Sequence, residues 1–359
     1  MATINSTAND GQTPNLPFTS ERLQAALRRH LADERLTLTE IADDGPADRD
    51  TVQLLTAHYH SGEQGGSLAL ACKRGFEEGS VAADDKVLAG ADRREIRFYH
   101  ELGTKVPLKL PTLVDSELEA DPPWLLLTRL PATTLDRHAW QPAHYRRTVL
   151  DLAKLHAEFW EDHTLWQRDW LWRPTAVHGS NLLENARQSW QAIQRDQGQR
   201  DLFFEPQVWA AFLEQPEFVS QRLQYFPSTL VHGDPNASNV VLPSSGPPVW
   251  FDWQFVAHAP GLLDLVVLYT ASAYWQREPP ALREMLALYS EELNRLRVRL
   301  PWSSAMEEGL DAMLVWYTAI WWLPQIVRLD VRVGQDFAER GLRQRILPQA
   351  EEALARLLA

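Results

Sequence analysis

The sequence has little cysteine, no long apolar run and no basic start. Cys72 is its only cysteine, which excludes an internal disulfide and any metal centre built on several cysteines. The most apolar segment, residues 313–323, is too short to span a bilayer, so we expect no membrane segment. Residues 1–14 lack the basic and apolar stretches of a secretory signal, and we expect a disordered tail over residues 1–18. These absences favour a cytoplasmic protein.

Basic residues are also in deficit, because 48 acidic residues stand against 35 basic ones and give a net charge of −13. A surface of this sign repels the phosphate backbone of nucleic acids, so we expect no nucleic-acid partner. Hydrophobic residues make up 45% of the chain, enough for the core of a folded enzyme. A chain of 359 residues is longer than one core usually fills, so two lobes are expected. The sequence sets no oligomeric state.

Short strand-like runs dominate the first third of the chain. An amphipathic pattern predicts a first helix over residues 19–32, and residues 91–102 predict the main helix of this part. Turn-rich pieces separate the strand-like runs, which is typical of an antiparallel sheet. The predicted strands are residues 36–41, 51–59, 67–73 and 124–130.

The rest of the chain has the apolar spacing of helices. We therefore predict an α+β protein with a small antiparallel-sheet lobe over residues 19–130 and a larger, mostly helical lobe over residues 131–359. Pro324 is expected to end the last long helix, because proline cannot continue the hydrogen-bonding pattern. The predicted helices of the second lobe are residues 144–160, 206–225, 261–275, 280–297 and 303–323.

Two polar segments of the second lobe, VHGDPNASNVVL and VWFDWQ, lie between apolar residues. We expect each polar group on a short loop between strands, where a rigid scaffold positions it. The first segment carries Asp234 and Asn239, and the second carries Asp252. Phosphoryl transfer needs one carboxylate to orient the attacking hydroxyl and oxygen ligands for Mg²⁺. The letters HGDPN alone would also fit a simple turn, but the later asparagine and aspartate favour a catalytic loop.

The order of these residues resembles the H-R-D-x-x-x-x-N and D-F-G segments of protein kinases, with glycine in place of arginine. More closely, it resembles the H-G-D-x-x-x-x-N and downstream aspartate motif of the aminoglycoside phosphotransferase, choline kinase and ecdysteroid-kinase-like families. The resemblance implies a two-lobed protein-kinase-like fold. It also implies an enzyme that uses Mg²⁺ and ATP, with GTP as an alternative, to phosphorylate a small-molecule hydroxyl.

The resemblance further implies a role for each residue of the motif. Asp234 is expected to be the catalytic base that orients the hydroxyl. Asn239 is expected to be a metal ligand, and Asp252 the main metal ligand, bridging the β- and γ-phosphates. Gly233 is expected to allow a tight backbone, and His232 to be structural.

Two residues outside the motif are expected to support it. Asp264 lies in the apolar segment GLLDLVVLY, and a buried carboxylate needs hydrogen-bond donors, so we expect it to accept backbone N–H groups. A simple helix cap is the alternative. In folds that this chain resembles, such an aspartate braces the catalytic loop. His156, in LAKLHAEFW, is expected to be a packed, hydrogen-bonded helix residue and no catalyst.

A kinase-like fold also implies a lysine on the third strand and a glutamate on the next helix. Lys73 ends the segment SLALACK, and Glu95 lies in REIRFYHEL, which resembles the E-x-x-F-Y helix of the ecdysteroid-kinase-like group. We expect the two to pair and to hold the α- and β-phosphates, with Glu101 as the alternative partner. Taken singly, each would be an ordinary surface charge.

The remaining nucleotide contacts have weaker signals. The resemblance places the hinge, which binds adenine through backbone groups, at Thr128, Arg129 and Leu130. The loop of residues 42–50 should cover the phosphates, yet it contains one glycine and four aspartates. Carboxylates beside a triphosphate are unfavourable unless metal ions or Arg49 intervene. The glycine-richer SGEQGG segment is expected to be a distal hairpin turn.

The acceptor is the least determined part of the prediction. Aromatic walls with carboxylates suit a cationic or amphipathic small molecule, although most tryptophans are expected in the core. Three functions stay open: a kinase for an antibiotic, a metabolic kinase for choline, a sugar or a steroid-like alcohol, and a non-catalytic nucleotide-binding regulator. A protein kinase is disfavoured, because no Asp-Phe-Gly or Ala-Pro-Glu signature follows the catalytic loop. The candidate tryptophans are Trp160, Trp166, Trp170, Trp172, Trp275, Trp302, Trp316, Trp321 and Trp322.

Overall fold

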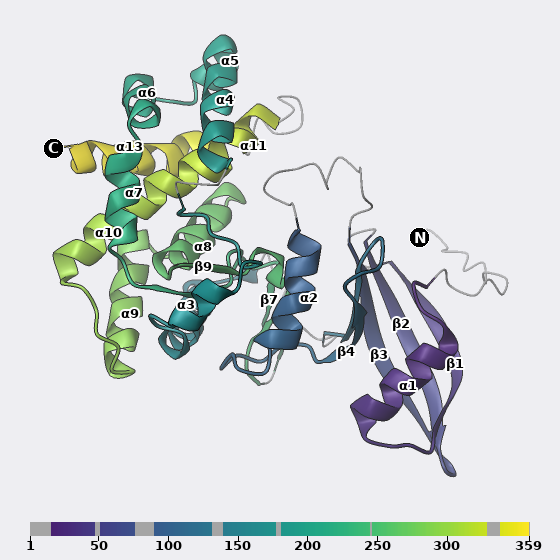
Figure 1. Cartoon of the computed structure of the whole chain (residues 1–359). Helices are drawn as coiled ribbons and strands as arrows, with labels where there is room; N and C mark the ends of the chain where they lie inside the picture. The colour runs from purple at the N-terminus through teal and green to yellow at the C-terminus, as the bar shows by residue number, and fades with distance from the viewer. Residues whose placement is uncertain are drawn as a thin grey trace, which may run out of the picture. The chain divides into compact units, whose positions relative to one another are not determined.

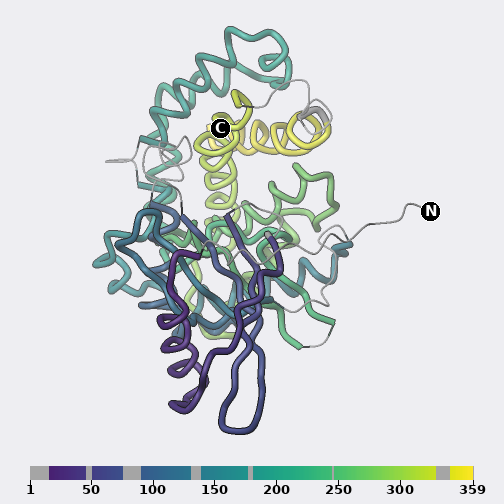
Figure 2. The backbone as a smooth tube through the Cα atoms, turned by 90° about the vertical axis from the view of Figure 1, so that its right-hand side faces the viewer, coloured from purple at the N-terminus to yellow at the C-terminus, as the bar shows by residue number. Residues whose placement is uncertain are grey.

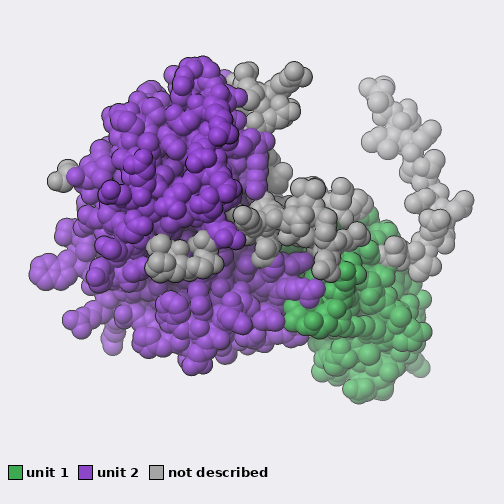
Figure 3. Space-filling view, turned by 45° about the horizontal axis from the view of Figure 1, so that its top comes forward, with its two compact units in different colours: residues 1–78, 111–129 green, residues 79–110, 130–359 purple. Residues whose placement is uncertain are grey.

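The computed structural model describes residues 16–46, 51–75, 90–130, 139–176, 181–244, 246–328 and 338–358. Most of the tail predicted over residues 1–18 lies outside these residues, as does Arg49. Contacts divide the chain into two compact units (Figures 1 and 3). The first unit comprises residues 1–78 and 111–129, and the second comprises residues 79–110 and 130–359. The predicted lobe boundary after residue 130 stays a prediction, and the segment 79–110 groups with the helical unit.

The first unit is a five-stranded antiparallel sheet with one helix packed on it. The strand order is β1-β2-β3-β5-β4, and β2 and β3 form the long hairpin seen in Figure 2. The hairpin turns at Gly62 and Glu63, within the predicted SGEQGG turn, and residues 64–66 of that segment already belong to β3. The elements of this unit are α1 (Ser20–Leu31), β1 (Leu36–Pro46), β2 (Val52–Ser61), β3 (Gln64–Arg74), β4 (Leu113–Glu117) and β5 (Trp124–Thr128).

Helix α1 forms where the sequence supplies both a cap and an apolar face. The Thr19 side chain accepts the backbone N–H of Arg22, which satisfies one of the free donors at the helix start. Leu23, Ala26 and Leu27 are buried against the sheet in a core with Leu55, Leu70 and Trp124. This burial supplies the stability that a helix of this length lacks by itself.

Strand β1 is longer than predicted. It continues to Pro46, so the first half of the expected phosphate-covering loop is strand, and residues 47–50 lie outside the described residues. The pairing with β2 shifts register between Asp43 and Gly45. Gly45 has a φ of +89°, and its N–H donates a hydrogen bond to the Asp43 side chain. Glycine adopts this left-handed conformation without strain, so the strand can form a bulge here and continue its pairing with β2.

The second unit is mostly helical and contains two short two-stranded sheets. β6 (Ser228–Val231) pairs with β9 (Ala257–Pro260), and β7 (Val240–Val241) pairs with β8 (Val249–Trp250). Its longer helices are α2 (Ala91–Glu101), α3 (Pro142–Glu158), α4 (Leu182–Arg195), α6 (Pro206–Glu214), α7 (Glu217–Gln224), α8 (Leu262–Tyr274), α9 (Leu282–Arg295), α10 (Ser303–Tyr317) and α13 (Leu347–Leu358). The sequence analysis missed β4, α4 and α13.

Two helix predictions are wrong in detail. The predicted helix over residues 206–225 is two helices, α6 and α7, because Pro216 between them has no N–H to donate. Pro324 does not end the helical run after α10. A π-helical turn (Thr318–Trp322) follows α10, and Pro324 lies in the first turn of α11 (Leu323–Arg328). The Leu323 N–H donates to the Thr318 carbonyl oxygen five residues back, so the helical run passes Pro324 through the wider bonding of the π-helical turn.

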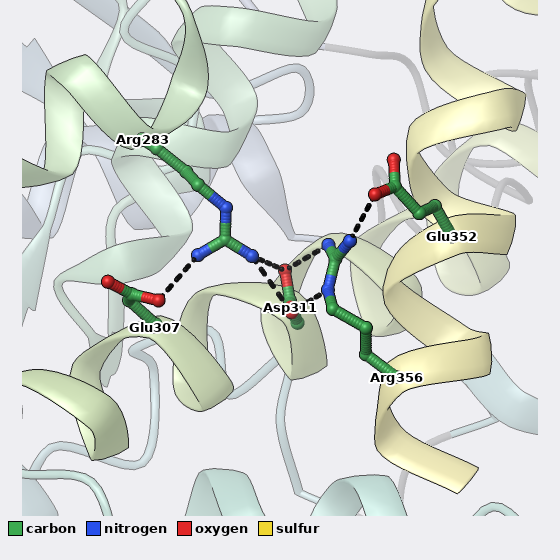
Figure 4. Close-up of polar contacts among 5 residues, drawn as sticks. All are labelled: Arg283, Glu307, Asp311, Glu352 and Arg356. Atoms are coloured by element: carbon green, nitrogen blue, oxygen red, sulfur yellow. Dashed lines mark hydrogen bonds and ion pairs between the residues drawn. The ribbon is translucent and has the colours of Figure 1, made fainter. Parts of the chain in front are cut away.

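A buried carboxylate joins α9, α10 and α13 (Figure 4). Asp311 is 7% exposed and accepts hydrogen bonds from the guanidinium groups of Arg283 and Arg356. Glu307 and Glu352 each pair with one of these arginines. Two-pronged contacts of this kind offset the loss of hydration at the carboxylate, so the C-terminal helix is held on the helical unit.

In the described part of the chain, no helix is both long enough and apolar enough to cross a membrane. The cytoplasmic location stays a prediction.

Candidate active site

The HGD segment begins where β6 ends. Gly233 follows the strand with a φ of +83°, and a Cβ atom at this position would lie 2.0 Å from the carbonyl oxygen of Phe255. Both the left-handed conformation and the close backbone approach require glycine. The tight backbone expected at this residue is therefore present, and it brings the loop against the segment that follows Asp252.

Asp264 holds the start of this loop. Its carboxylate accepts the backbone N–H of His232 at 2.8 Å and that of Gly233 at 2.8 Å. Its Oδ2 also lies 3.1 Å from Nε2 of His156, whose Nδ1 contacts the hydroxyl of Tyr289 at 2.8 Å. Asp264 and His156 are both fully buried. The carboxylate therefore has the backbone donors expected for it, and the histidine is the packed helix residue expected for it.

The imidazole of His232 is part of the same scaffold. It is fully buried, and its Nε2 lies 3.0 Å from the carbonyl oxygen of Phe251, so Nε2 donates. Its Nδ1 accepts the backbone N–H of Asp234 at 3.2 Å. This pair of contacts assigns one neutral tautomer. The ring joins the HGD segment to Phe251, the residue before Asp252.

Asp234 and Asn239 are in direct contact. The Asn239 amide donates to Oδ2 of Asp234 at 2.8 Å and to its carbonyl oxygen at 3.0 Å. Oδ1 of Asp234 accepts the side-chain amide of Asn236 at 2.7 Å. These bonds fix the plane of the carboxylate. Because both amide hydrogens of Asn239 are donated, its Oδ1 is the atom of this side chain that can serve a cation.

Asp252 lies between β8 and a 3₁₀ turn, η3 (Trp253–Phe255). The β7–β8 pairing and the bond from the Phe251 N–H to the Asn239 carbonyl oxygen, 3.2 Å, bring this aspartate beside the segment that carries Asp234 and Asn239. Asp252 is 6% exposed and has φ and ψ of 61° and 59°. A non-glycine residue in the left-handed region carries strain, and such residues cluster at functional sites.

Glu95 of α2 is 2% exposed and binds the same turn. Its Oε1 accepts the backbone N–H of Trp253 at 3.0 Å, directly after Asp252. Phe98, one turn on, stacks on the Trp253 ring with centroids 4.1 Å apart. Lys73 is on β3 in the first unit, so its pairing with Glu95 stays a prediction. Glu101, the alternative partner, accepts Nε1 of Trp170 at 3.2 Å.

The expected hinge follows β5. Thr128 donates its N–H to the carbonyl oxygen of Thr112, and Arg129 donates its N–H to that of Ala69, both at 2.9 Å. The Arg129 guanidinium binds the Leu55 carbonyl oxygen and pairs with Asp44. These groups stabilise the sheet. Among the three expected hinge residues, Thr128 and Arg129 thus donate their N–H groups to carbonyl oxygens of the sheet. Within the described part of the chain, Leu130 does not.

Arg94 is a site residue that sequence reasoning missed. It lies on the buried face of α2, is 8% exposed, and binds the carbonyl oxygens of Gln254 and Trp170. A signal for it was present in the sequence. Arg94 lies three residues after Ala91 and four before Phe98, so the sequence already placed a charged residue on the apolar face of this helix.

A family model described as the phosphotransferase enzyme family matches residues 82–300, more than half of the chain. The chain belongs to this family. Among solved structures, this phosphotransferase is similar to the aminoglycoside phosphotransferase from Alicyclobacillus acidocaldarius, with 15% identity, a TM-score of 0.52 and coverage of 97% of each chain. It is also similar to the choline kinase LicA from Streptococcus pneumoniae, with 14% identity, a TM-score of 0.51 and coverage of 93% of this chain and 99% of that one. A comparison with curated protein sequences finds no match.

These findings confirm the family and the protein-kinase-like fold that the sequence implied. They also confirm the reaction class, since this chain is a phosphotransferase that acts on a hydroxyl group of a small molecule.

Proposed function

We propose that this phosphotransferase moves the γ-phosphoryl group of ATP, or of GTP, to its acceptor hydroxyl with Asp234 as the catalytic base. The observation that carries the proposal is the catalytic loop. Asp234 and Asn239 are bonded to each other, and the buried carboxylate of Asp264 holds the two residues that precede Asp234. Phosphoryl transfer depends mainly on positioning and electrostatics, which a loop braced in this way supplies.

The step assigned to Asp234 is proton acceptance. A carboxylate has about four lone-pair sites, so the bonds from Asn236 and Asn239 still permit contact with a hydroxyl. The acceptor oxygen forms a bond to the γ-phosphorus, and the bond from that phosphorus to the oxygen of the leaving nucleoside diphosphate breaks. The hydroxyl proton moves to the Asp234 carboxylate.

Asn239 and Asp252 are proposed to hold Mg²⁺. Their donor chemistry fits this ion, because an amide oxygen and a carboxylate are hard oxygen ligands and Mg²⁺ is usually bound by one or two protein groups plus phosphates. The described residues contain no group of three or more acidic, histidine or cysteine side chains that could hold a metal by themselves. Nucleotide phosphates would thus complete the coordination. When bound, the ion neutralises charge on the β- and γ-phosphates.

The nucleotide is proposed to be bound by the residues that the sequence indicated for it. Lys73 is assigned to the α- and β-phosphates, with Glu95 as its partner. The backbone of Thr128, Arg129 and Leu130 is assigned to adenine, with Leu130 as the donor. A structure of LicA in complex with AMP supports a nucleotide as co-substrate. LicA is 14% identical to this chain, the match covers 94% of this chain, and the TM-score is 0.52.

The acceptor is proposed to be a cationic or amphipathic small molecule, including an antibiotic or choline, bound beside an aromatic face near Asp234. Tyr317 stacks on the partly exposed Trp321 with an interplanar angle of 9°, and Trp321 meets the ring of Phe255 at 88°. Burial, followed by the charges of Asp234 and Asp264, holds the pKa of Tyr317 well above its ordinary value. This influence of Asp234 on the Tyr317 pKa supports an aromatic face near the proposed base.

Burial disfavours two of the nine candidate tryptophans as acceptor contacts. Trp316 is fully buried and donates to the carbonyl oxygen of Pro174, while Trp322 is 5% exposed and packs on Tyr274. Such residues belong to the core. Trp321 and Trp172 keep partial exposure beside Phe255 and are the better candidates for acceptor contact.

A product-mass screen tests the proposal. ATP and GTP are each incubated with Mg²⁺ and with aminoglycosides, macrolides, choline, sugars and steroid alcohols, and the phosphorylated product and nucleoside diphosphate are measured. Asp234→Asn is the matched control. We expect at least one acceptor to gain a phosphoryl group with the wild type and to gain almost none with the variant. Equal turnover by both proteins would refute the catalytic loop, while a best acceptor that is anionic would refute only the acceptor class.

A further inference from the structure

The guanidinium of Arg94 sits at the turn that follows Asp252. Nη1 of Arg94 lies 2.5 Å from the carbonyl oxygen of Gln254, and its Nε lies 3.2 Å from that of Trp170. Burial lowers the pKa of this arginine to about 10, so it stays charged at neutral pH. A charged group is costly to bury unless it is hydrogen-bonded, and backbone carbonyls supply those bonds here.

Two consecutive residues of α2 thereby bind two consecutive residues of the turn η3. Glu95 accepts the N–H of Trp253, while Arg94 donates to the carbonyl of Gln254. Glu95 accepts a hydrogen bond and Arg94 donates one, so neither side chain can take over the contact of the other if the peptide groups of the turn rotate. Together they fix both the position and the direction of the peptide groups that follow Asp252.

Asp252 needs such restraint because of its backbone. Its φ of 61° places a residue with a side chain in the left-handed region, which few residues other than glycine adopt. A strained residue persists only where its surroundings determine its conformation. On its other side, the backbone of Phe251 is held by the carbonyl oxygen of Asn239 and by the ring of His232.

We propose that Arg94 is a positioning residue that holds Asp252 in its left-handed conformation and thereby sets the affinity of the site for Mg²⁺. The inference rests on the proposed role of Asp252 as a metal ligand. Arg94 does not touch the ion or the nucleotide in this scheme. It acts through the turn, as an outer contact that orients a ligand, and the loss of such contacts typically costs 10-fold to 100-fold in metal affinity.

The same guanidinium has a second attachment that extends its effect. Its bond to the Trp170 carbonyl oxygen holds a segment that also contains Trp172, which is hydrogen-bonded to the residues at the start of β9. Trp172 receives the N–H of His258 on its carbonyl oxygen at 2.9 Å and donates its own N–H to Val256 at 3.3 Å. Arg94 thus holds η3 and the chain that flanks β9 in one arrangement.

Calorimetric titration of ATP at a series of Mg²⁺ concentrations, and once with EDTA, tests the inference on the full-length protein. The variants are Arg94→Ala and Arg94→Lys. The control is Arg97→Ala on the same helix, whose side chain is 40% exposed and meets the 95%-exposed Asp169 at 3.9 Å. We expect equal ATP affinity for all proteins in EDTA. In Mg²⁺, Arg94→Ala should need a roughly 10-fold to 100-fold higher Mg²⁺ concentration for half-maximal ATP binding, and Arg97→Ala should match the wild type.

Arg94→Lys keeps the charge and most of the stem but lacks the planar fork that reaches two carbonyl groups, so we expect it to restore the Mg²⁺ response only in part. Thermal unfolding without ligand shows whether each variant is folded, and the lysine variant carries the test if the alanine variant is not. A folded Arg94 variant with the wild-type Mg²⁺ midpoint would overturn the inference. An unchanged midpoint in Asp252→Asn would instead overturn the metal site, so the two failures are distinguishable.

Discussion

The side-chain amide of Asn239 donates to Oδ2 of Asp234 at 2.8 Å, so the proposed metal ligand and the proposed base form one hydrogen-bonded unit. The same amide also donates to the Asp234 carbonyl oxygen at 3.0 Å. Asn239 therefore holds the backbone and the side chain of the aspartate together. Loss of the Asn239 side chain would disturb the proposed base as well as the proposed metal site, so variants of Asp234 and Asp252 separate chemistry from binding better.

Asp234→Asn should slow phosphoryl transfer while nucleotide binding survives. The amide cannot accept the hydroxyl proton, and loss of a positioned general base typically costs about 10²-fold to 10⁴-fold in rate. Single-turnover rates give the loss of chemistry, and calorimetric titration of Mg²⁺-ATP gives the binding. A variant that turns over at the wild-type rate would show that the VHGDPNASN segment is no catalytic loop.

Asp252→Asn should reduce both metal-dependent nucleotide affinity and turnover. The substitution removes a charged oxygen ligand from the ion that neutralises the β- and γ-phosphates. The same two measurements apply, with ATP binding in EDTA as the control that should not change. A loss of rate with full Mg²⁺-dependent affinity would assign this aspartate a role in chemistry and none in metal binding.

Lys73→Ala should weaken productive nucleotide use and leave the fold intact. The side chain is at the end of β3, and the lost contact to phosphate is charge-assisted, so about 1.5–3 kcal/mol is expected. This corresponds to a fall in kcat/KM for ATP, measured beside the thermal unfolding midpoint. Unchanged kcat/KM together with unchanged ATP affinity would contradict the assignment.

Asp264→Asn should destabilise the protein and misplace the catalytic loop. The carboxylate is fully buried and accepts two backbone N–H groups, and leaving buried donors without a charged acceptor costs about 1–3 kcal/mol. Urea unfolding gives the loss of stability. Asp169→Asn, at a side chain that is 95% exposed, is the matched control and should change nothing measurable. Equal stability of the two variants would mean that Asp264 is a dispensable helix cap.

His258 should make the free energy of unfolding fall as the pH is lowered. Burial, and then the positive charge of Arg173, lowers the pKa of this histidine to about 4 in the folded protein, against the opposing charge of Asp162. The unfolded chain takes up the proton near pH 6.5. Between about pH 6.5 and pH 4 the unfolded state therefore binds more protons, and stability is lost as pH falls through that window.

Urea unfolding from pH 7 to pH 4.5 measures this slope. His258→Gln should show a shallower fall in the free energy of unfolding than the wild type. His60→Gln, at an exposed position on β2, should keep the wild-type slope. A slope in His258→Gln as steep as that of the wild type would assign the pH dependence to other groups.

Local chemistry is what the sequence alone determined. The HGD motif, the asparagine five residues later and the aspartate beyond it lie on short loops between short strands, and the family resemblance that their order carries was sufficient to indicate the reaction class. Gly233 was recognisable for the same reason, since a tight turn after a strand favours glycine. The cap of α1 and the apolar spacing of α1 and α2 likewise located those helices, because each follows from contacts within a few residues.

Long-range contacts were decided only by the tertiary structure. Arg94 and Glu95 both bind the turn after Asp252. The sequence separation between Arg94 and Gln254 is 160 residues. Asp264 reaches His156 across 108 residues. The sequence could say that a buried charge needs partners, but not which partners. That choice depends on how helices and strands pack, because hydrogen bonds form only between groups that folding brings within about 3 Å of each other.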